Sequence, residues 1–178
     1  MGRLLVVVDY QNDFVKGALG FEDAKSLEDK IFDKVKTYLK NGDKVLFTYD
    51  THFDNYLETR EGKNLPIKHC IYGSDGHALY GKLKQFKNID NTIHYNKEAF
   101  GISPDSMICL YEEIGEVKEI EFVGIVTNMC VISNVVMFQS QYKNANIIVD
   151  GKLCSSFNME LHNKSLDVIE GLQVKVIR

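Results

Sequence analysis

Apolar residues along the chain form two kinds of pattern, continuous runs and runs with helical spacing. The continuous runs are rich in β-branched residues, which is typical of strands buried on both faces of a sheet. They predict strands at residues 3–9, 44–49, 92–95, 119–126, 146–150 and 173–177. Between the first two strands, apolar residues recur at every fourth position from Leu27 to Leu39, which predicts a helix that stops at Asn41-Gly42.

Helical patterns also follow the later strands. Ser103 is a good helix cap and Pro104 suits the first turn, so a helix is expected from there to Gly115. Further helices are predicted at residues 129–142 and 158–172, a short one at 76–86, and a loop at 51–75. Strands that alternate with helices predict an α/β fold, in which helices cover both faces of a mainly parallel sheet. Ligands bind beyond the carboxyl ends of the strands in such sheets.

Composition narrows the possible partners. The 178 residues suit one domain, and 44% are hydrophobic and 26% charged, with a net charge of −4. There is no basic stripe for nucleic acid and no Lys/Arg block for a membrane surface, and the longest apolar runs are too short to span a bilayer. A strand near the N-terminus leaves no room for a secretory signal. We therefore expect a cytoplasmic protein that binds a small molecule, with no nucleic-acid or membrane partner.

Three reactive side chains follow predicted strands. Asp9 ends the first, Lys97 follows the third, and Cys130 lies where the fourth strand passes into a helix. Alone, such an acid can simply cap the chain, such a lysine is usually solvated, and such a cysteine usually packs as a small hydrophobe. Together at one sheet edge they suit nucleophilic catalysis, because the carboxylate can take the thiol proton while the lysine and the helix N-terminus favour thiolate.

The remaining cysteines carry less chemistry. All four are widely separated and none forms a CxxC pair, which disfavours a structural zinc site, a thioredoxin-type pair and a disulfide framework. Cys109 is expected in the buried face of its amphipathic helix. Cys154 is expected to pack in the core or line a pocket.

A metal site is the second candidate constellation. Asp50, His52 and His69 offer one carboxylate and two imidazoles, a set that suits Zn²⁺, Fe²⁺ or Mn²⁺. The Asp-x-His spacing lets the first two side chains point the same way along an extended segment. Glu58 and Glu61 are both candidates for a fourth ligand. The other histidines, His77, His94 and His162, are interpreted as structural or solvated, with His162 on a polar helix face.

Five segments in order resemble the motifs of one family. They are "VVVDYQNDF" with Asp9, "YDTHFD" with Asp50 and His52, "HCIYGSDG" with His69, "NKEAFG" with Lys97, and "GIVTNMCV" with Cys130. On these motifs the chain resembles the isochorismatase-like cysteine hydrolases, and among them it is most similar to the nicotinamidases. The resemblance spans essentially the whole chain.

The resemblance implies a single isochorismatase-like hydrolase domain over residues 1–178. Its fold would be a three-layer αβα arrangement with Rossmann-like topology, in which helices cover both faces of a six-stranded, mainly parallel sheet. It also implies a cis peptide between Val126 and Thr127, and an oxyanion hole formed by the backbone N–H groups of Val126 and Cys130. Asp9 would be the base, Cys130 the nucleophile and Lys97 the third catalytic residue. A homo-oligomer is usual among such relatives.

The reaction implied is hydrolysis of a small aromatic amide, such as nicotinamide, to the acid and ammonia through a thioester. A divalent metal, Zn²⁺ first and Fe²⁺ or Mn²⁺ as alternatives, would bind the pyridine nitrogen and orient the substrate. The chain has no tryptophan to stack on the ring, so the aromatic wall is assigned to Phe14, Tyr49, Tyr95 or Phe100. The alternatives are a hydrolase of this fold for another amide or carbamoyl substrate, and a non-catalytic binding protein.

Overall fold

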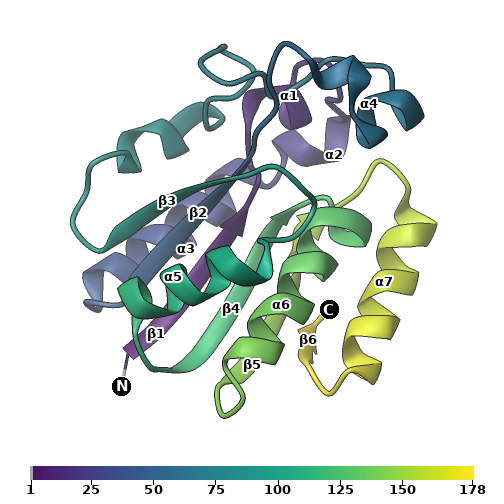
Figure 1. Ribbon diagram of the computed structural model, residues 1–178. Helices are drawn as coiled ribbons and strands as arrows, with labels where there is room; N and C mark the ends of the chain where they lie inside the picture. Colours follow the sequence, from purple (N-terminus) through teal and green to yellow (C-terminus); the bar gives the residue numbers. More distant parts are fainter. Residues whose placement is uncertain (1) are drawn as a thin grey trace.

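A computed structural model describes residues 2–178, and within them six strands form one parallel sheet (Figure 1). The order across the sheet is β3-β2-β1-β4-β5-β6. The strands are β1 (Gly2–Val8), β2 (Lys44–Asp50), β3 (Thr92–Lys97), β4 (Val117–Ile125), β5 (Asn146–Ser155) and β6 (Lys175–Ile177). The α/β fold predicted from the alternating pattern is therefore confirmed, with the strand positions close to those expected.

Helices lie on both sides of the sheet (Figure 1). They are α1 (Asn12–Val15), α2 (Glu22–Lys25), α3 (Glu28–Lys40), α4 (Arg60–Asn64), α5 (Pro104–Ile114), α6 (Ile132–Gln141) and α7 (Met159–Gly171). Within residues 2–178, every helix is too short or too polar to cross a membrane.

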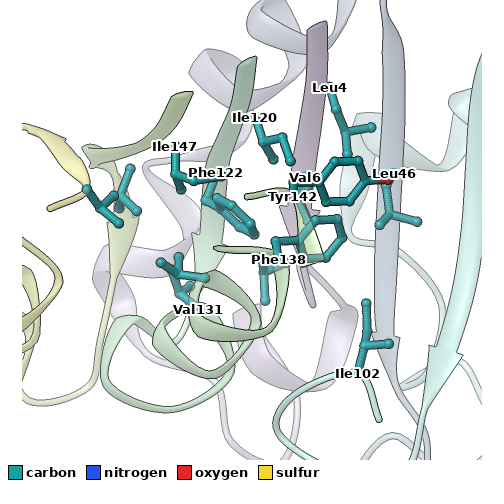
Figure 2. Packing of buried hydrophobic residues seen from close by; sticks show 14 of the residues in the cluster. Leu4, Val6, Leu46, Ile102, Ile120, Phe122, Val131, Phe138, Tyr142 and Ile147 are labelled. Carbon is teal, nitrogen blue, oxygen red and sulfur yellow. The ribbon is translucent and has the colours of Figure 1, made fainter. Parts of the chain in front are cut away.

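The sheet separates two apolar cores because successive side chains of a strand point to opposite faces. Leu4 and Val6 of β1 belong to the core beneath α5, α6 and α7, where Phe122 and Phe138 pack edge to face (Figure 2). Leu5 and Val7 belong to the core on the α3 side, together with Ile31 and Phe47. Both faces of the central strands are thus buried, which explains why their sequences are continuous apolar runs.

The connections differ from the expected elements at three places. The predicted loop at 51–75 contains a 3₁₀ turn, η1 (Tyr56–Glu58), and the helix α4, whose N-cap Thr59 accepts a hydrogen bond from the backbone N–H of Gly62. The short helix expected at 76–86 is a 3₁₀ helix, η2 (Gly81–Phe86). The helix after β4 begins with a π-helical turn, η3 (Thr127–Val131), ahead of α6. By contrast, Ser103 caps α5 as predicted.

Two single-residue interpretations were wrong. Cys109 is exposed, because the buried stripe of α5 runs through Met107, Leu110 and Ile114. Cys109 follows Met107 by two residues, about 200° around the helix axis, and so points away from the core. His162 is buried on α7, so its expected place on a polar helix face was wrong, whereas the structural one of its two expected roles agrees with this burial.

A glycine allows β1 and β4 to approach closely at their carboxyl ends. Gly124 has φ 115, and a Cβ built there would lie 2.2 Å from the carbonyl oxygen of Val8. Asp9, the residue after Val8, has φ 46, an uncommon value for a residue that is not glycine. This approach brings the segment after β1 next to the turn that carries Cys130.

Candidate active site

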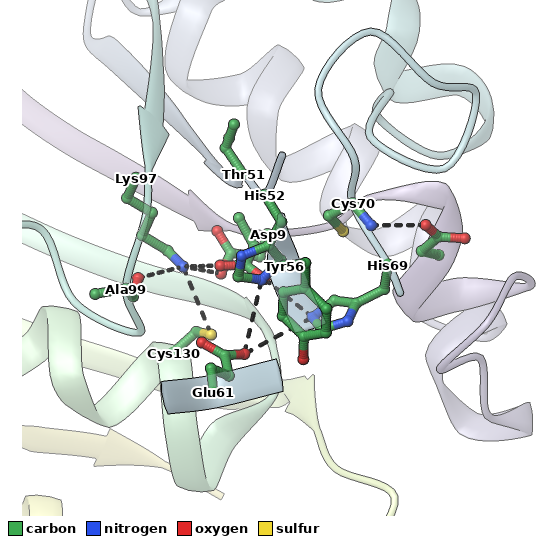
Figure 3. Close-up of polar contacts among 12 residues, drawn as sticks. Asp9, Thr51, His52, Tyr56, Glu61, His69, Cys70, Lys97, Ala99 and Cys130 are labelled. Atoms are coloured by element: carbon green, nitrogen blue, oxygen red, sulfur yellow. Dashed lines mark hydrogen bonds and ion pairs between the residues drawn. The ribbon is translucent and has the colours of Figure 1, made fainter. Parts of the chain in front are cut away.

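The carboxyl ends of four strands carry the reactive side chains. Asp9 follows β1, Asp50 ends β2, Lys97 ends β3, and Cys130 lies in η3 just after β4. The strands are adjacent and parallel, so these residues meet at one edge of the sheet (Figure 3). The structure therefore brings together the three catalytic candidates chosen from the sequence.

Lys97 connects the members of this cluster. Its Nζ lies 2.6 Å from Asp9 Oδ2 and 3.3 Å from Asp50 Oδ1. It also donates to the Ala99 carbonyl at 3.0 Å and lies 3.7 Å from Cys130 Sγ (Figure 3). Only 1% of the Lys97 side chain is exposed. Burial alone would lower the pKa of Lys97, but the attraction of Asp9, Cys130 and Asp50 raises this pKa well above its usual value. The side chain is therefore held as an ammonium ion.

Asp9 is fully buried beside this ammonium. Its Oδ1 accepts a hydrogen bond from Thr48 Oγ1 at 2.7 Å, which leaves Oδ2 to face Lys97. Burial raises the pKa of Asp9, an effect that the charge of Lys97 opposes. A carboxylate with a raised pKa is a better proton acceptor, which suits a general base.

Cys130 sits in a state different from that expected. Burial raises the pKa of its thiol well above the usual value, more than the nearby Lys97 lowers it, and a hydrogen bond to Asp9 adds to the increase. Lys97 thus acts toward thiolate, as expected, but burial outweighs it, and the net shift of the pKa is opposite to the one expected. A thiol whose pKa is raised in this way is protonated at neutral pH, so a nucleophilic role would require its proton to leave as the sulfur attacks.

The second constellation is a compact set of four possible metal ligands, Asp50, His52, Glu61 and His69, whose ligand atoms all lie within 4.8 Å of one another. Asp50 Oδ2 is 3.0 Å from His52 Nε2 and 3.4 Å from His69 Nε2. Glu61 Oε1 is 3.7 Å from the first imidazole and 3.8 Å from the second. Of the two glutamates left open by the sequence, Glu61 from α4 joins the set, and Glu58 in η1 does not.

The two carboxyl groups of this set, Asp50 and Glu61, have shifted pKa values. Burial would raise the pKa of Asp50, but the Lys97 ammonium and hydrogen bonds with His52 and His69 outweigh it and hold the pKa below its usual range. Burial raises the pKa of Glu61, and repulsion from Asp50 adds to that effect. A cation placed among these ligands would relieve that repulsion.

Several residues missed by the sequence reasoning hold this set in place. The side-chain amide of Gln11 both donates to the carbonyl and accepts from the N–H of Asp50, at 2.9 and 2.8 Å. Asp13 Oδ2 accepts from the N–H of Cys70 at 2.7 Å, and His69 Nδ1 lies 2.8 Å from the Ile67 carbonyl. Gln11 and Asp13 fall inside the "VVVDYQNDF" segment, whose polar letters were the available signal.

The turn that carries Cys130 is held from α7. His162 Nδ1 lies 2.8 Å from Thr127 Oγ1, and that hydroxyl donates to the Ser155 carbonyl at 3.0 Å. The hydroxyl must then accept from the imidazole. The cis peptide joins Ile125 and Val126, so its expected position between Val126 and Thr127 was wrong by one residue.

An apolar cavity of about 420 Å³ opens onto Cys130, Asp50, His69 and Glu61. Its apolar lining includes Phe14, Leu19, Leu65, Phe100, Met129 and Phe157. Of the four aromatic residues expected there, Phe14 and Phe100 line this cavity, whereas Tyr49 and Tyr95 line other hollows. The ring of Tyr49 instead stacks on His77, and its hydroxyl lies 2.8 Å from His94 Nδ1. Phe157, in the segment between β5 and α7, was not foreseen.

Comparison with known proteins agrees with this geometry. A family model described as an isochorismatase domain matches residues 3–178. The chain belongs to the isochorismatase family, as its motifs predicted.

Individual relatives are similar over most or all of their length. The sequence is 28% identical over 170 residues to the Bacillus subtilis (strain 168) protein named "Uncharacterized isochorismatase family protein PncA", with 91% of each chain covered. A crystal structure of nicotinamidase PncA from Bacillus subtilis matches with TM-score 0.87 at 27% identity, over 100% of both chains. Pyrazinamidase of Pyrococcus horikoshii in complex with zinc shares the fold, with TM-score 0.85 at 19% identity over 100% of this chain and 99% of that one. The protein is thus an enzyme, a nicotinamidase-like hydrolase acting on C–N bonds outside peptides.

Proposed function

We propose that the protein is a cysteine amidohydrolase that converts a small aromatic amide, such as nicotinamide, into the acid and ammonia through a thioester. One observation carries the proposal: a buried lysine ammonium lies between a carboxylate, Asp9, and a thiol, Cys130, at the wall of an apolar cavity. The similarity to a nicotinamidase structure supports the choice of amide.

In the first half-reaction, Asp9 takes the proton of Cys130 as the sulfur attacks the amide carbonyl carbon. The carbonyl electrons move onto oxygen, where the backbone N–H groups of Val126 and Cys130 are proposed to stabilise the charge. Asp9 then returns its proton to the nitrogen, the C–N bond breaks, and ammonia leaves a thioester behind.

In the second half-reaction, Asp9 takes a proton from water, which attacks the thioester carbon. The C–S bond breaks, the proton goes back to sulfur, and the acid is released. Lys97 remains an ammonium throughout. It fixes the orientation of Asp9 and offsets the negative charge on sulfur in both steps.

The cluster of Asp50, His52, Glu61 and His69 fits a divalent metal. Ligand bonds of about 2.0–2.1 Å in a tetrahedral site place ligand atoms about 3.3–3.4 Å apart, close to the spacing of these four. His69 Nδ1 faces a backbone carbonyl and therefore carries the proton, so Nε2 presents its lone pair to the site. Nitrogen and carboxylate ligands suit Zn²⁺ first, with Fe²⁺ or Mn²⁺ as alternatives. When bound, the metal would supply a Lewis acid for the ring nitrogen of the substrate.

The cavity supports an aromatic substrate. Phe14, Phe100 and Phe157 line its walls, and Cys130 lies among them. Flat rings pack well against such side chains, so the scissile amide is directed toward the sulfur while the ring is desolvated. These phenylalanines stand in for the tryptophan that the chain lacks. A homo-oligomer and a cytoplasmic location stay predictions from the sequence.

Ammonia release tests this proposal. The zinc-loaded protein is mixed with nicotinamide, benzamide, a short aliphatic amide and an N-carbamoyl amino acid, and ammonia is measured over time. We expect nicotinamide to be turned over fastest and benzamide more slowly, because benzamide lacks the ring nitrogen. Ammonia from the carbamoyl compound alone would replace the proposed substrate class, and no ammonia from any compound would contradict hydrolysis of amides.

A further inference from the structure

A second cavity, of about 570 Å³, lies between β2, β3 and the segment from Tyr72 to η2. The short teal helix above β3 in Figure 1 is η2. We name this space the lysine-lined cavity, and its defining residues are Tyr49, Tyr72, His77, Lys84, Lys87 and His94. Among residues 2–178, no residue lines both this cavity and the catalytic one.

The charge of the lysine-lined cavity is positive. Lys84 and Lys87 both line it, and none of its lining residues within positions 2–178 is acidic. The counter-charge beside it is Asp75, whose Oδ1 lies 3.6 Å from the Nζ of Lys84; the side chain of Asp75 is 75% exposed and that of Lys84 is 47% exposed. Such an exposed pair is weak, so both ammonium groups remain available to an incoming anion.

The other walls are flat and neutral. The ring of Tyr49 stacks on His77 with centroids 5.5 Å apart, and Tyr72 meets the same imidazole edge-on at 5.5 Å. Tyr49 Oη lies 2.8 Å from His94 Nδ1, which joins the two sides of the cavity. Burial lowers the pKa of both His77 and His94, and the charge of Lys87 acts in the same direction. Tyr72 is 59% exposed, so its ring is accessible to a ligand.

We propose that the lysine-lined cavity binds a small planar aromatic anion. The ring lies against Tyr72 and His77, and the carboxylate or phosphate group is held by Lys84 and Lys87. Ring stacking and charge-assisted hydrogen bonds are both needed, because exposed lysines alone hold an anion weakly. An aromatic carboxylate and a nucleoside monophosphate share this chemistry.

Contacts connect this cavity with the candidate metal segment. His77 Nε2 lies 2.9 Å from Thr51 Oγ1, on the residue between Asp50 and His52. The side-chain amide of Gln11 also donates to the carbonyls of both Asp50 and His77. The wall that would hold the ring is thus bonded directly to the segment that carries two possible metal ligands.

Titration calorimetry at low ionic strength tests the proposal, with adenosine 5′-monophosphate and benzoate as probes. Adenosine supplies a ring without the anion, and inorganic phosphate supplies an anion without the ring. We expect one or both probes to bind, and adenosine and inorganic phosphate to bind at least about ten-fold more weakly than the better probe. The preferred probe identifies the source of the anion.

Matched variants locate the binding. Lys84→Gln/Lys87→Gln should weaken the preferred probe at least about ten-fold, because two charge-assisted hydrogen bonds are lost. Lys118→Gln/Lys164→Gln removes the same charge from exposed positions on β4 and α7 and should leave binding unchanged. Tyr72→Ala should weaken binding, and Tyr72→Phe should retain it. All these side chains are exposed, so thermal melting should show folded variants.

Three results would overturn the proposal. They are the absence of binding by either probe at millimolar concentration, equal binding by wild type and Lys84→Gln/Lys87→Gln, and inorganic phosphate binding as tightly as the better probe. The measurement involves no turnover. A failure of the amidase proposal therefore leaves it standing, and a failure here leaves the amidase proposal standing.

Discussion

Two lysines in this molecule each lie between two carboxylates, yet their surroundings differ. Lys97 contacts Asp9 and Asp50 with 1% of its side chain exposed. Lys34 of α3 contacts Glu121 of β4 and Asp150 of β5 with 21% exposed. The ionic arrangement is similar, so it cannot by itself mark a catalytic site.

The two lysines differ in the other groups that surround them. Beside Lys97 lie a thiol, a set of imidazoles and an apolar cavity. Beside Lys34 the additional partner is the hydroxyl of Tyr38, which donates to Glu121 at 2.6 Å. The first cluster can move a proton between a base and a nucleophile, whereas the second joins a helix to the sheet. Reactive neighbours and an accessible cavity, rather than buried charge, therefore distinguish the candidate site.

The largest expected difference between the two clusters concerns activity. Lys97→Gln should reduce kcat/KM for the amide by on the order of 10³, because Asp9 loses its orientation and the sulfur loses its counter-charge. Lys34→Gln should change kcat/KM less than about three-fold. Steady-state ammonia release measures both, and a Lys97→Gln enzyme with more than a tenth of wild-type activity would remove the distinction.

The next largest difference between the Lys97 and Lys34 clusters concerns stability. In metal-free protein, Lys97→Gln leaves Asp9 and Asp50 buried without their cation and should lower the free energy of unfolding by about 3–5 kcal/mol. Lys34→Gln, at a partly exposed pair, should lower it by about 1 kcal/mol. Urea unfolding monitored by circular dichroism gives both values. Equal losses of unfolding free energy would show that the two clusters contribute equally to stability.

Metal affinity tests the imidazole side of the comparison. Glu61→Gln should weaken zinc binding by about 10–100-fold or more. Replacing a residue that merely hydrogen-bonds to a metal ligand already weakens metal binding by about that factor. Glu58→Gln is the matched control, because Glu58 lies outside the ligand set. Competition with a zinc chelator measures the affinity. Equal effects of the two substitutions would refute the assignment of Glu61.

The smallest effect concerns thiol reactivity. The raised pKa of Cys130 predicts slow alkylation by iodoacetamide at pH 7, slower than at the exposed Cys109, with the Cys130 rate still rising above pH 9. The alkylation rate rises with pH because burial disfavours the reactive thiolate until the pH approaches the raised pKa. Peptide mapping of alkylated protein reads both sites. Faster labelling of Cys130 at pH 7 would mean that Lys97 outweighs burial.

Much of this arrangement could be predicted from the sequence. Asp9, Lys97 and Cys130 each follow a recognisable strand, and parallel strands carry their carboxyl ends to one edge. The choice of Glu61 over Glu58 could not be predicted, because it depends on how α4 turns after its cap at Thr59. Phe157 was missed because a connecting segment carries no periodic pattern. The effect of Lys97 on the thiol has the expected direction, but the larger effect of burial could not be predicted, because burial is not visible in one sequence.

Whether Cys130 is the nucleophile can be measured by ammonia release from two cysteine variants. Cys130→Ala and Cys109→Ala are compared with wild type under the same metal loading and amide concentration. We expect no measurable turnover by Cys130→Ala and full turnover by Cys109→Ala, whose side chain lies on the exposed face of α5. Wild-type turnover by Cys130→Ala would contradict a nucleophilic role of Cys130.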